Sequence, residues 1–173
     1  EFSVVEAELE EAERASGLLR DLREAKLFQG EDLKSNIKQL EPRVTPKDRE
    51  ASSLLGELKA QQALEEKDTM LTKLPIPTGR VRRVRRGPDL IREATIRYVN
   101  SLQVPLSAAS LEVSFLDGPD TEPIATRVFS LPLSGTLKPG STTEIVFSLE
   151  PSPEGWNGKT ISLSHKDITL ATE

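Results

Sequence analysis

Hydrophobic residues change their spacing along this chain, from a helical period before about residue 75 to a two-residue period after about residue 90. Within residues 4–28 they recur at steps of three and four, which predicts an amphipathic helix. The opposite face of this helix is rich in Glu and Arg and is expected to face water. Its hydrophobic face contains Val5, Leu9, Ala12, Leu19, Leu22 and Ala25, widened by Val4, Ala15, Leu18 and Leu27.

Two further segments before residue 75 also have helical spacing. Residues 31–41 form the second predicted helix, because their leucines and isoleucine lie at positions i, i+4 and i+7. A third helix is predicted to start at Thr45, whose side chain would cap it, with Pro46 at the first helical position. This third helix is expected to run to about residue 67 or 70. Three amphipathic helices can cover one another's hydrophobic faces, so a small bundle or hairpin is expected.

From residue 90 on, hydrophobic and polar residues alternate, as they do in strands that bury one face. Turn-forming Gly, Pro, Asn and Asp residues separate the alternating segments at intervals typical of a two-layer β-sandwich. A closed barrel is the alternative arrangement. Six strands are predicted, over residues 91–100, 109–116, 125–133, 142–149, 159–165 and 168–171.

The sequence therefore predicts an α+β protein in three parts. Residues 1–74 form a helical region, residues 75–89 a linker rich in Pro and Arg, and residues 90–173 an antiparallel β-sandwich. The linker is expected to be either a solvated connection or an edge strand whose charges discourage pairing with other sheets. Its arginines are also candidate contacts for an acidic partner, for anionic lipid headgroups or for the acidic helices. These candidates are Arg82, Arg83, Arg85 and Arg86, with Arg80 beside them.

Composition narrows the possible functions. The 173 residues carry a net charge of −5, and only 36% are hydrophobic and 4% aromatic, which fits a modest β core with solvated helices. The acidic balance, and the lack of aromatic residues among the linker arginines, argue against a nucleic-acid partner. No segment approaches the ~20 apolar residues that span a bilayer. The chain has no cysteine, which excludes disulfides, thiolate nucleophiles and cysteine-bound zinc.

The order of turns and strands in the second half follows a known pattern. A strand ends at Asn100, a polar stretch with one proline covers residues 101–107, and a turn follows in residues 113–118. Residues 137–140 form a Pro-Gly turn that leads into the apolar residues 145–147. Over about residues 90–150 the chain resembles the FxLYD-type immunoglobulin-like sandwiches of bacterial envelope proteins. The resemblance implies an immunoglobulin-like β-sandwich in an extracytoplasmic, periplasmic or membrane-anchored setting, with a cytoplasmic one as the alternative, and implies no activity.

Candidate catalytic and metal-binding groups are few. His165, the single histidine, precedes Asp167 by two residues and has serines nearby. A Ser-His-Asp mechanism also needs an activated nucleophile and an oxyanion hole, and the sequence offers no motif for either. His165 is therefore expected to be a surface residue, and the chain is not expected to be an enzyme. Asp117, Asp120 and Glu122 lack the spacing of a calcium-binding loop, so no metal or cofactor is predicted.

Two features remain as candidate interaction sites. Trp156, the single tryptophan, lies in a loop rich in Pro and Gly, where it would either close one end of the sandwich or contact a partner. On the first helix, Leu9, Leu19 and Leu22 could dock a protein partner or pair with a second copy of the chain. We therefore expect a non-enzymatic structural or adaptor module that mediates protein–protein interaction in a bacterial cell envelope. The alternative is a recognition domain that binds a glycan or another surface component through the Trp156 loop.

Overall fold

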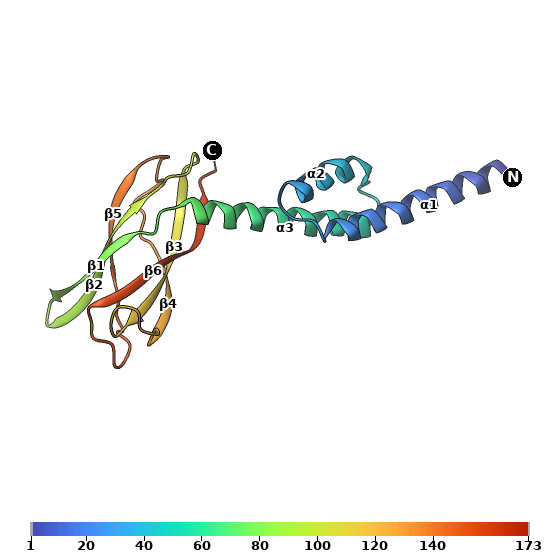
Figure 1. Ribbon diagram of the computed structural model, residues 1–173. Helices are drawn as coiled ribbons and strands as arrows, with labels where there is room; N and C mark the ends of the chain where they lie inside the picture. Colours follow the sequence, from blue (N-terminus) through green and yellow to red (C-terminus); the bar gives the residue numbers. More distant parts are fainter. Residues whose placement is uncertain (1, 173) are drawn as a thin grey trace. The chain divides into compact units, whose positions relative to one another are not determined.

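A computed structural model describes residues 2–172 of the chain. Three helices are followed by six strands, so the chain belongs to the α+β class (Figure 1). The chain divides into two compact units, with the boundary between Thr69 and Met70. We call these the helical unit and the β unit. The helices are α1 (Phe2–Ala25), α2 (Gly30–Leu40) and α3 (Arg49–Lys73), and a short 3₁₀ turn covers Glu41–Arg43.

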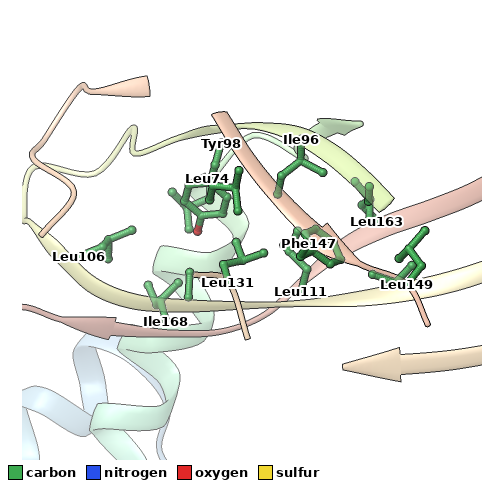
Figure 2. Close-up of a cluster of buried hydrophobic side chains, with 14 of the residues drawn as sticks. Leu74, Ile96, Tyr98, Leu106, Leu111, Leu131, Phe147, Leu149, Leu163 and Ile168 are labelled. Carbon is green, nitrogen blue, oxygen red and sulfur yellow. The ribbon is translucent and has the colours of Figure 1, made fainter. Parts of the chain in front are cut away.

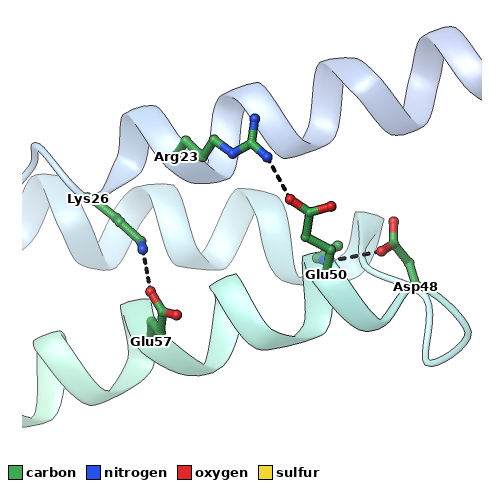
Figure 3. Close-up of polar contacts among 6 residues, drawn as sticks. Arg23, Lys26, Asp48, Glu50 and Glu57 are labelled. Atoms are coloured by element: carbon green, nitrogen blue, oxygen red, sulfur yellow. Dashed lines mark hydrogen bonds and ion pairs between the residues drawn. The ribbon is translucent and has the colours of Figure 1, made fainter.

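The helical unit is held together by a small hydrophobic core. All three helices contribute to it, and the predicted face of α2 is buried. Two ion pairs to α3 lie at the rim, one from Arg23 of α1 to Glu50 at 2.6 Å and one from Lys26, just after α1, to Glu57 (Figure 3). Because these pairs are exposed, each contributes at most about 1 kcal/mol, and the core carries the stability. Its buried residues are Leu18, Leu22, Ala25, Leu33, Ile37, Leu40, Ala51, Leu55 and Leu58.

The prediction that the third helix starts at Thr45 is wrong. Helix α3 begins at Arg49, and the Asp48 carboxylate caps it by accepting a hydrogen bond from Ala51 N at 3.0 Å (Figure 3). Asp48 N donates to Thr45 O at 3.0 Å, which closes a turn with Pro46 at its second position. Proline suits the second position of a turn as well as the first position of a helix, and Asp caps as well as Thr.

The β unit consists of two antiparallel sheets of three strands each. One sheet has the order β1-β2-β5 and the other has the order β4-β3-β6. The strands are β1 (Thr78–Arg86), β2 (Asp89–Val99), β3 (Leu106–Leu116), β4 (Ala125–Ser130), β5 (Thr142–Ser148) and β6 (Thr160–Leu170).

Both sheets bury side chains in one hydrophobic core (Figure 2). Leu111, Val113 and Phe115 of β3 are fully buried, as their two-residue spacing predicts. From the first sheet, Ile96 and Phe147 are buried in the same core. Met70, Leu71 and Leu74, at the end of α3 and just after it, also pack against these residues. Side chains from both sheets thus hold the β unit together.

Of the two structures expected for residues 75–89, the edge strand is confirmed and the solvated connection is wrong. Most of this segment is strand β1, which pairs with β2 along its whole length through a turn at Gly87 and Pro88. Gly87 has a positive φ of 62°, which glycine adopts without the strain other residues would incur. The sequence left both structures open because the two half-buried residues of the strand, Val81 and Val84, are three positions apart and break the two-residue alternation.

The last two predicted strands form a single strand, β6. An irregularity in the pairing with β3 explains the difference, because Ser110 lies opposite Asp167 while the next residue, Leu111, lies opposite His165. The extra residue in β6 reverses the order of inward and outward side chains. Leu163 and Ile168 are five positions apart, so regular alternation would place them on opposite faces. Because of the extra residue, both are buried.

Candidate functional site

Strand β1 forms the edge of its sheet and carries all five arginines of the segment 80–86. It is hydrogen-bonded to β2 on one side only. Paired residues in an antiparallel sheet share a face, so the side of each arginine follows from its partner in β2. Ala94 and Ile96 of β2 are buried in the core, which makes their side of the sheet the inner face and the other side the outer face.

The arginines lie on both faces of the β1–β2 ribbon. Arg80, Arg82 and Arg86 lie on the outer face, where their partners in β2 are Thr95, Glu93 and Asp89. Arg83 and Arg85 lie on the inner side, beyond the core, opposite Arg92 and Leu90. The end of the ribbon that carries Arg83 and Arg85 extends past β5, because β5 pairs with β2 only from Glu93 onward.

Glu93 engages two of the arginines. Its side chain is buried although it lies on the outer face, and Arg86 Nε and Nη2 both donate to Glu93 Oε1, at 3.1 and 2.8 Å. Arg82 Nη2 lies 3.9 Å from Glu93 Oε2. A buried carboxylate requires such positive neighbours, because an unpaired buried charge costs several kcal/mol. Arg82 and Arg86 therefore stabilise the fold by pairing with Glu93, in addition to adding positive charge to the surface.

The other three arginines of β1 are not neutralised. Within residues 2–172, no acidic group forms an ion pair with Arg80, Arg83 or Arg85. Arg83 lies directly opposite Arg92, and like charges at opposite positions of a ladder are destabilising. The Arg92 guanidinium is held in place by Ser152 Oγ at 3.3 Å and by the Trp156 ring at 5.6 Å. The β1 edge therefore presents concentrated positive charge.

A shallow cleft of about 290 Å³ lies on the outer face beside Arg80. Thr95 and Arg97 of β2 and Glu144 of β5 also line it. Thr95 is only 6% exposed, and its hydroxyl has no hydrogen-bond partner among the described residues. A buried hydroxyl without a partner is unusual and marks a place where a polar ligand atom could be accommodated. Arg80 and Arg97 make the cleft positive, and Glu144 offsets part of that charge.

The remaining predicted contact residues are distributed unevenly. On α1, Leu22 is fully buried in the helical core and cannot contact a partner, whereas Leu19 is half-buried and packs against that core. Leu9 is 62% exposed, as is Val5 one turn earlier. Of the three predicted leucines, Leu9 is therefore the one that is largely exposed.

Trp156 does not provide an exposed contact. It is 8% exposed, its Nε1 donates to Thr160 O at 2.8 Å, and its ring meets Phe115 edge to face at 4.9 Å. The indole therefore packs at the end of the core under the Arg92 guanidinium. Of the two roles considered for this residue, the structure favours closing the core over contacting a partner.

The histidine is engaged in local packing. His165 Nε2 donates to Pro75 O at 2.9 Å, and its ring meets Tyr98 edge to face at 5.6 Å. Asp167 lies opposite Ser110 in the ladder, and its carboxylate accepts a hydrogen bond from Ile168 N at 3.0 Å. Within the described part of the chain, no group of three or more His, Asp or Glu side chains could hold a metal ion.

Two other ionisable groups in the β unit are perturbed. Burial raises the pKa of Tyr98 to about 12. Burial also acts to raise the pKa of Glu150, but hydrogen bonds from Arg92 N and from Ser152, together with the Arg92 charge, hold that pKa below its ordinary value of 4.5. Burial of Tyr98 disfavours its charged form, whereas the hydrogen bonds of Glu150 favour its charged form. Neither residue lines the cleft.

None of the helices in residues 2–172 contains a stretch long and apolar enough to cross a membrane. Comparison with protein-family models, with curated proteins and with solved structures finds no significant match to this chain. The site must therefore be interpreted from its own geometry. Thr95 and Arg97 are not among the site residues predicted from the sequence, although the alternation of β2 places both on the face opposite Ala94 and Ile96.

Proposed function

We propose that the chain is a non-enzymatic adaptor module that binds a protein partner through the edge of strand β1. The observation that carries this proposal is the combination of an unpaired strand edge with three arginines, Arg80, Arg83 and Arg85, that no described acidic group neutralises. An exposed edge offers backbone hydrogen bonds, and exposed arginines are frequent in protein interfaces. A surface of this kind serves binding rather than chemistry.

The β unit is proposed to be immunoglobulin-like. In that fold strands A, B and E share one sheet, while strand C pairs with strand F and can carry strand C′ on its other side. The orders β1-β2-β5 and β4-β3-β6 correspond to A-B-E and C′-C-F. The resemblance of residues 90–150 to FxLYD-type domains supports the same fold, and it alone supports a place in the bacterial envelope.

The helical unit is proposed to pair with a second copy of the chain. The first half of α1 exposes Val5 and Leu9 and is strongly acidic. This half of α1 continues into an open groove of about 550 Å³ whose lining includes Arg14, Arg43 and Lys47 as well as Glu11 and Asp48. Two copies in antiparallel order would bring the acidic end of one α1 near the three basic side chains of the other. Sedimentation over a range of concentrations, with Leu9→Lys as the variant, tests this pairing.

A glycan-binding role is not favoured. The alternative required an exposed indole as a platform for a sugar ring, and Trp156 is buried and hydrogen-bonded. An anionic lipid surface could also meet the arginines, and it enters below as a competing outcome of the binding experiment.

Photo-crosslinking in the cells that make the protein tests the adaptor function. A photoreactive amino acid replaces Arg85 on β1, Leu9 on α1 or, as a control, the exposed Lys138 in the turn before β5. We expect a distinct covalent adduct with another protein from position 85 and none from position 138. If neither position 85 nor position 9 gives a protein adduct while the chain is folded and abundant, the proposed function is wrong.

A further inference from the structure

We infer that the β1 edge takes up an acidic, extended protein segment as an additional strand. This inference rests on the proposed function and names the partner's chemistry. Three observations carry it: the unpaired edge, the arginines without acidic partners, and the cleft beside Arg80. The backbone of an extended segment satisfies the edge, and its carboxylates satisfy the arginines and the cleft.

The first observation concerns the backbone. Among residues 2–172, no hydrogen bond outside the β1–β2 ladder involves the main chain of residues 80–88. A strand edge that is left open in this way is a template for another extended segment. The same arginines that would repel a second β1 strand attract an acidic one, so the edge discriminates between partners.

The second observation fixes the spacing of the acidic residues. Side chains opposite each other in a ladder are separated by about 5 Å at Cβ, within reach of an ion pair. In an antiparallel added strand, the residue opposite Arg85 precedes the residue opposite Arg83 by two positions. The residue opposite Arg80 then follows three positions later. The partner therefore has the pattern acidic-x-acidic-x-x-acidic, written from its N-terminus.

The third observation provides a specific place for one carboxylate. The partner residue opposite Arg80 lies on the outer face, as does the cleft of about 290 Å³. There Arg97 of β2 lies diagonally across from Arg80. A carboxylate can accept hydrogen bonds from these two guanidinium groups.

The surroundings favour a narrow partner over a membrane or a nucleic acid. Residues 100–173 carry nine acidic and four basic side chains, and Asp89 and Glu144 flank the arginines on β2 and β5. A lipid surface or a duplex is broad and would bring its phosphates against these carboxylates. A single extended strand meets only the arginines, and it alone also uses the backbone edge.

The test measures binding of a labelled ten-residue peptide by fluorescence anisotropy. The peptide carries Glu at positions 4, 6 and 9 among Thr and Val, and a matched peptide has N-methyl groups at alternate amides. We expect the first peptide to bind and to protect the amides of residues 80–86 from hydrogen exchange. N-methylation should weaken binding about tenfold or more, because it keeps the charge and blocks the ladder.

Two double variants of equal net charge separate a specific site from general attraction. Arg83→Glu with Arg85→Glu should weaken binding about tenfold or more, since it reverses the charges that face the peptide. Lys138→Glu with Lys159→Glu changes two exposed lysines of the same unit and should leave binding unchanged.

The inference is overturned if the peptide does not bind to the folded chain or if both double variants weaken it equally. It is also overturned if the N-methylated peptide binds as well. Vesicles containing phosphatidylserine and a single-stranded oligonucleotide serve as competitors, and stronger binding of either would assign the arginines to that ligand instead. Protein adducts from position 85 without peptide binding would leave the adaptor function standing and remove only the acidic strand.

Discussion

The Asn100 side chain donates a hydrogen bond from Nδ2 to the carbonyl of Leu137 at 3.0 Å, across 37 positions of sequence. Asn100 is fully buried, and the same Nδ2 donates to Val104 O at 3.0 Å while Oδ1 accepts from Leu102 N at 3.1 Å. One amide thus satisfies three backbone groups in two loops at the end of β2.

Replacing Asn100 with Ala should destabilise the β unit by about 2 kcal/mol or more, because Leu102 N and Val104 O lose their partner, whereas Leu137 O keeps the hydrogen bond from Leu106 N. The free energy of unfolding can be followed by the fluorescence of Trp156, the only tryptophan, which lies in this unit. Asn36→Ala serves as the control, since the exposed Asn36 bonds only to Asp32 O one turn earlier on α2. A loss of less than about 1 kcal/mol for Asn100→Ala would contradict the role of this network.

Tyr98→Phe should leave the β unit equally stable or make it up to about 1 kcal/mol more stable. The Tyr98 ring is fully buried, yet its hydroxyl has no hydrogen-bond partner within residues 2–172. Phe keeps the packing of the ring and removes the unsatisfied group. Tyr98→Ala, measured alongside by Trp156 fluorescence, should cost about 3–5 kcal/mol through the cavity it leaves. Marked destabilisation by Phe would show that the hydroxyl is satisfied in solution.

The β unit should lose stability as the pH falls below 4.5, and part of that loss should come from Glu150. The pKa of Glu150 is lower in the folded chain than its ordinary value of 4.5. Its contribution is therefore present above pH 4.5 and is lost as the pH falls toward the folded pKa. Glu150→Gln should be less stable than the natural chain at neutral pH, and the difference should shrink in acid. Glu154→Gln, at an exposed position of the same loop, should behave like the natural chain throughout.

Asp48→Ala should destabilise the helical unit by about 1 kcal/mol, the usual effect of removing a helix cap. The Asp48 carboxylate accepts the hydrogen bond from Ala51 N, whereas the side chain of Thr45 makes no hydrogen bond among the described residues. Thr45→Ala is accordingly expected to have little effect. Far-UV circular dichroism of the helices, followed during thermal unfolding, separates these two substitutions. The reverse order of effects would restore the sequence-based assignment of the cap to Thr45.

Gly79→Ala should destabilise the β unit by about 1–3 kcal/mol, the usual effect of overpacking. A Cβ at this position would lie 2.9 Å from Ile96 Cγ2 and 3.1 Å from Leu163 Cδ1, both in the core. Gly56→Ala is the matched control within α3, where an added Cβ meets nothing within 4 Å. Since Ala favours a helix over Gly, this control should stabilise the helical unit by up to about 1 kcal/mol.

Much of the fold could be predicted from side-chain spacing. The segment Leu111 to Phe115 alternates because every second residue is buried, and the prediction of a strand there is confirmed. The helical face of α2 is confirmed for the same reason. These predictions succeeded because a buried face leaves a regular pattern whose period depends only on the local conformation.

Other features could not be predicted because their cause lies elsewhere in the chain. Strand β1 has arginines at both inner and outer positions, so its sequence allowed an edge strand or a solvated connection, and only its pairing with β2 decides for the strand. The continuous β6 depends on an irregularity in its pairing with β3, which the sequence of β6 alone does not reveal. Trp156 could have been exposed or buried until Phe115 and Thr160 were placed beside it.

The sequence by itself determined that this protein begins with amphipathic helices, continues with half-buried strands and concentrates its positive charge between residues 80 and 97. Only the tertiary structure decided that five of these arginines lie on an open strand edge, that Glu93 engages two of them, and that Thr95 remains without a partner among the described residues. The physical reason is that periodicity records whether a side chain is buried. Pairing between strands decides which charges meet. It joins residues whose separation along the chain does not indicate that they are neighbours.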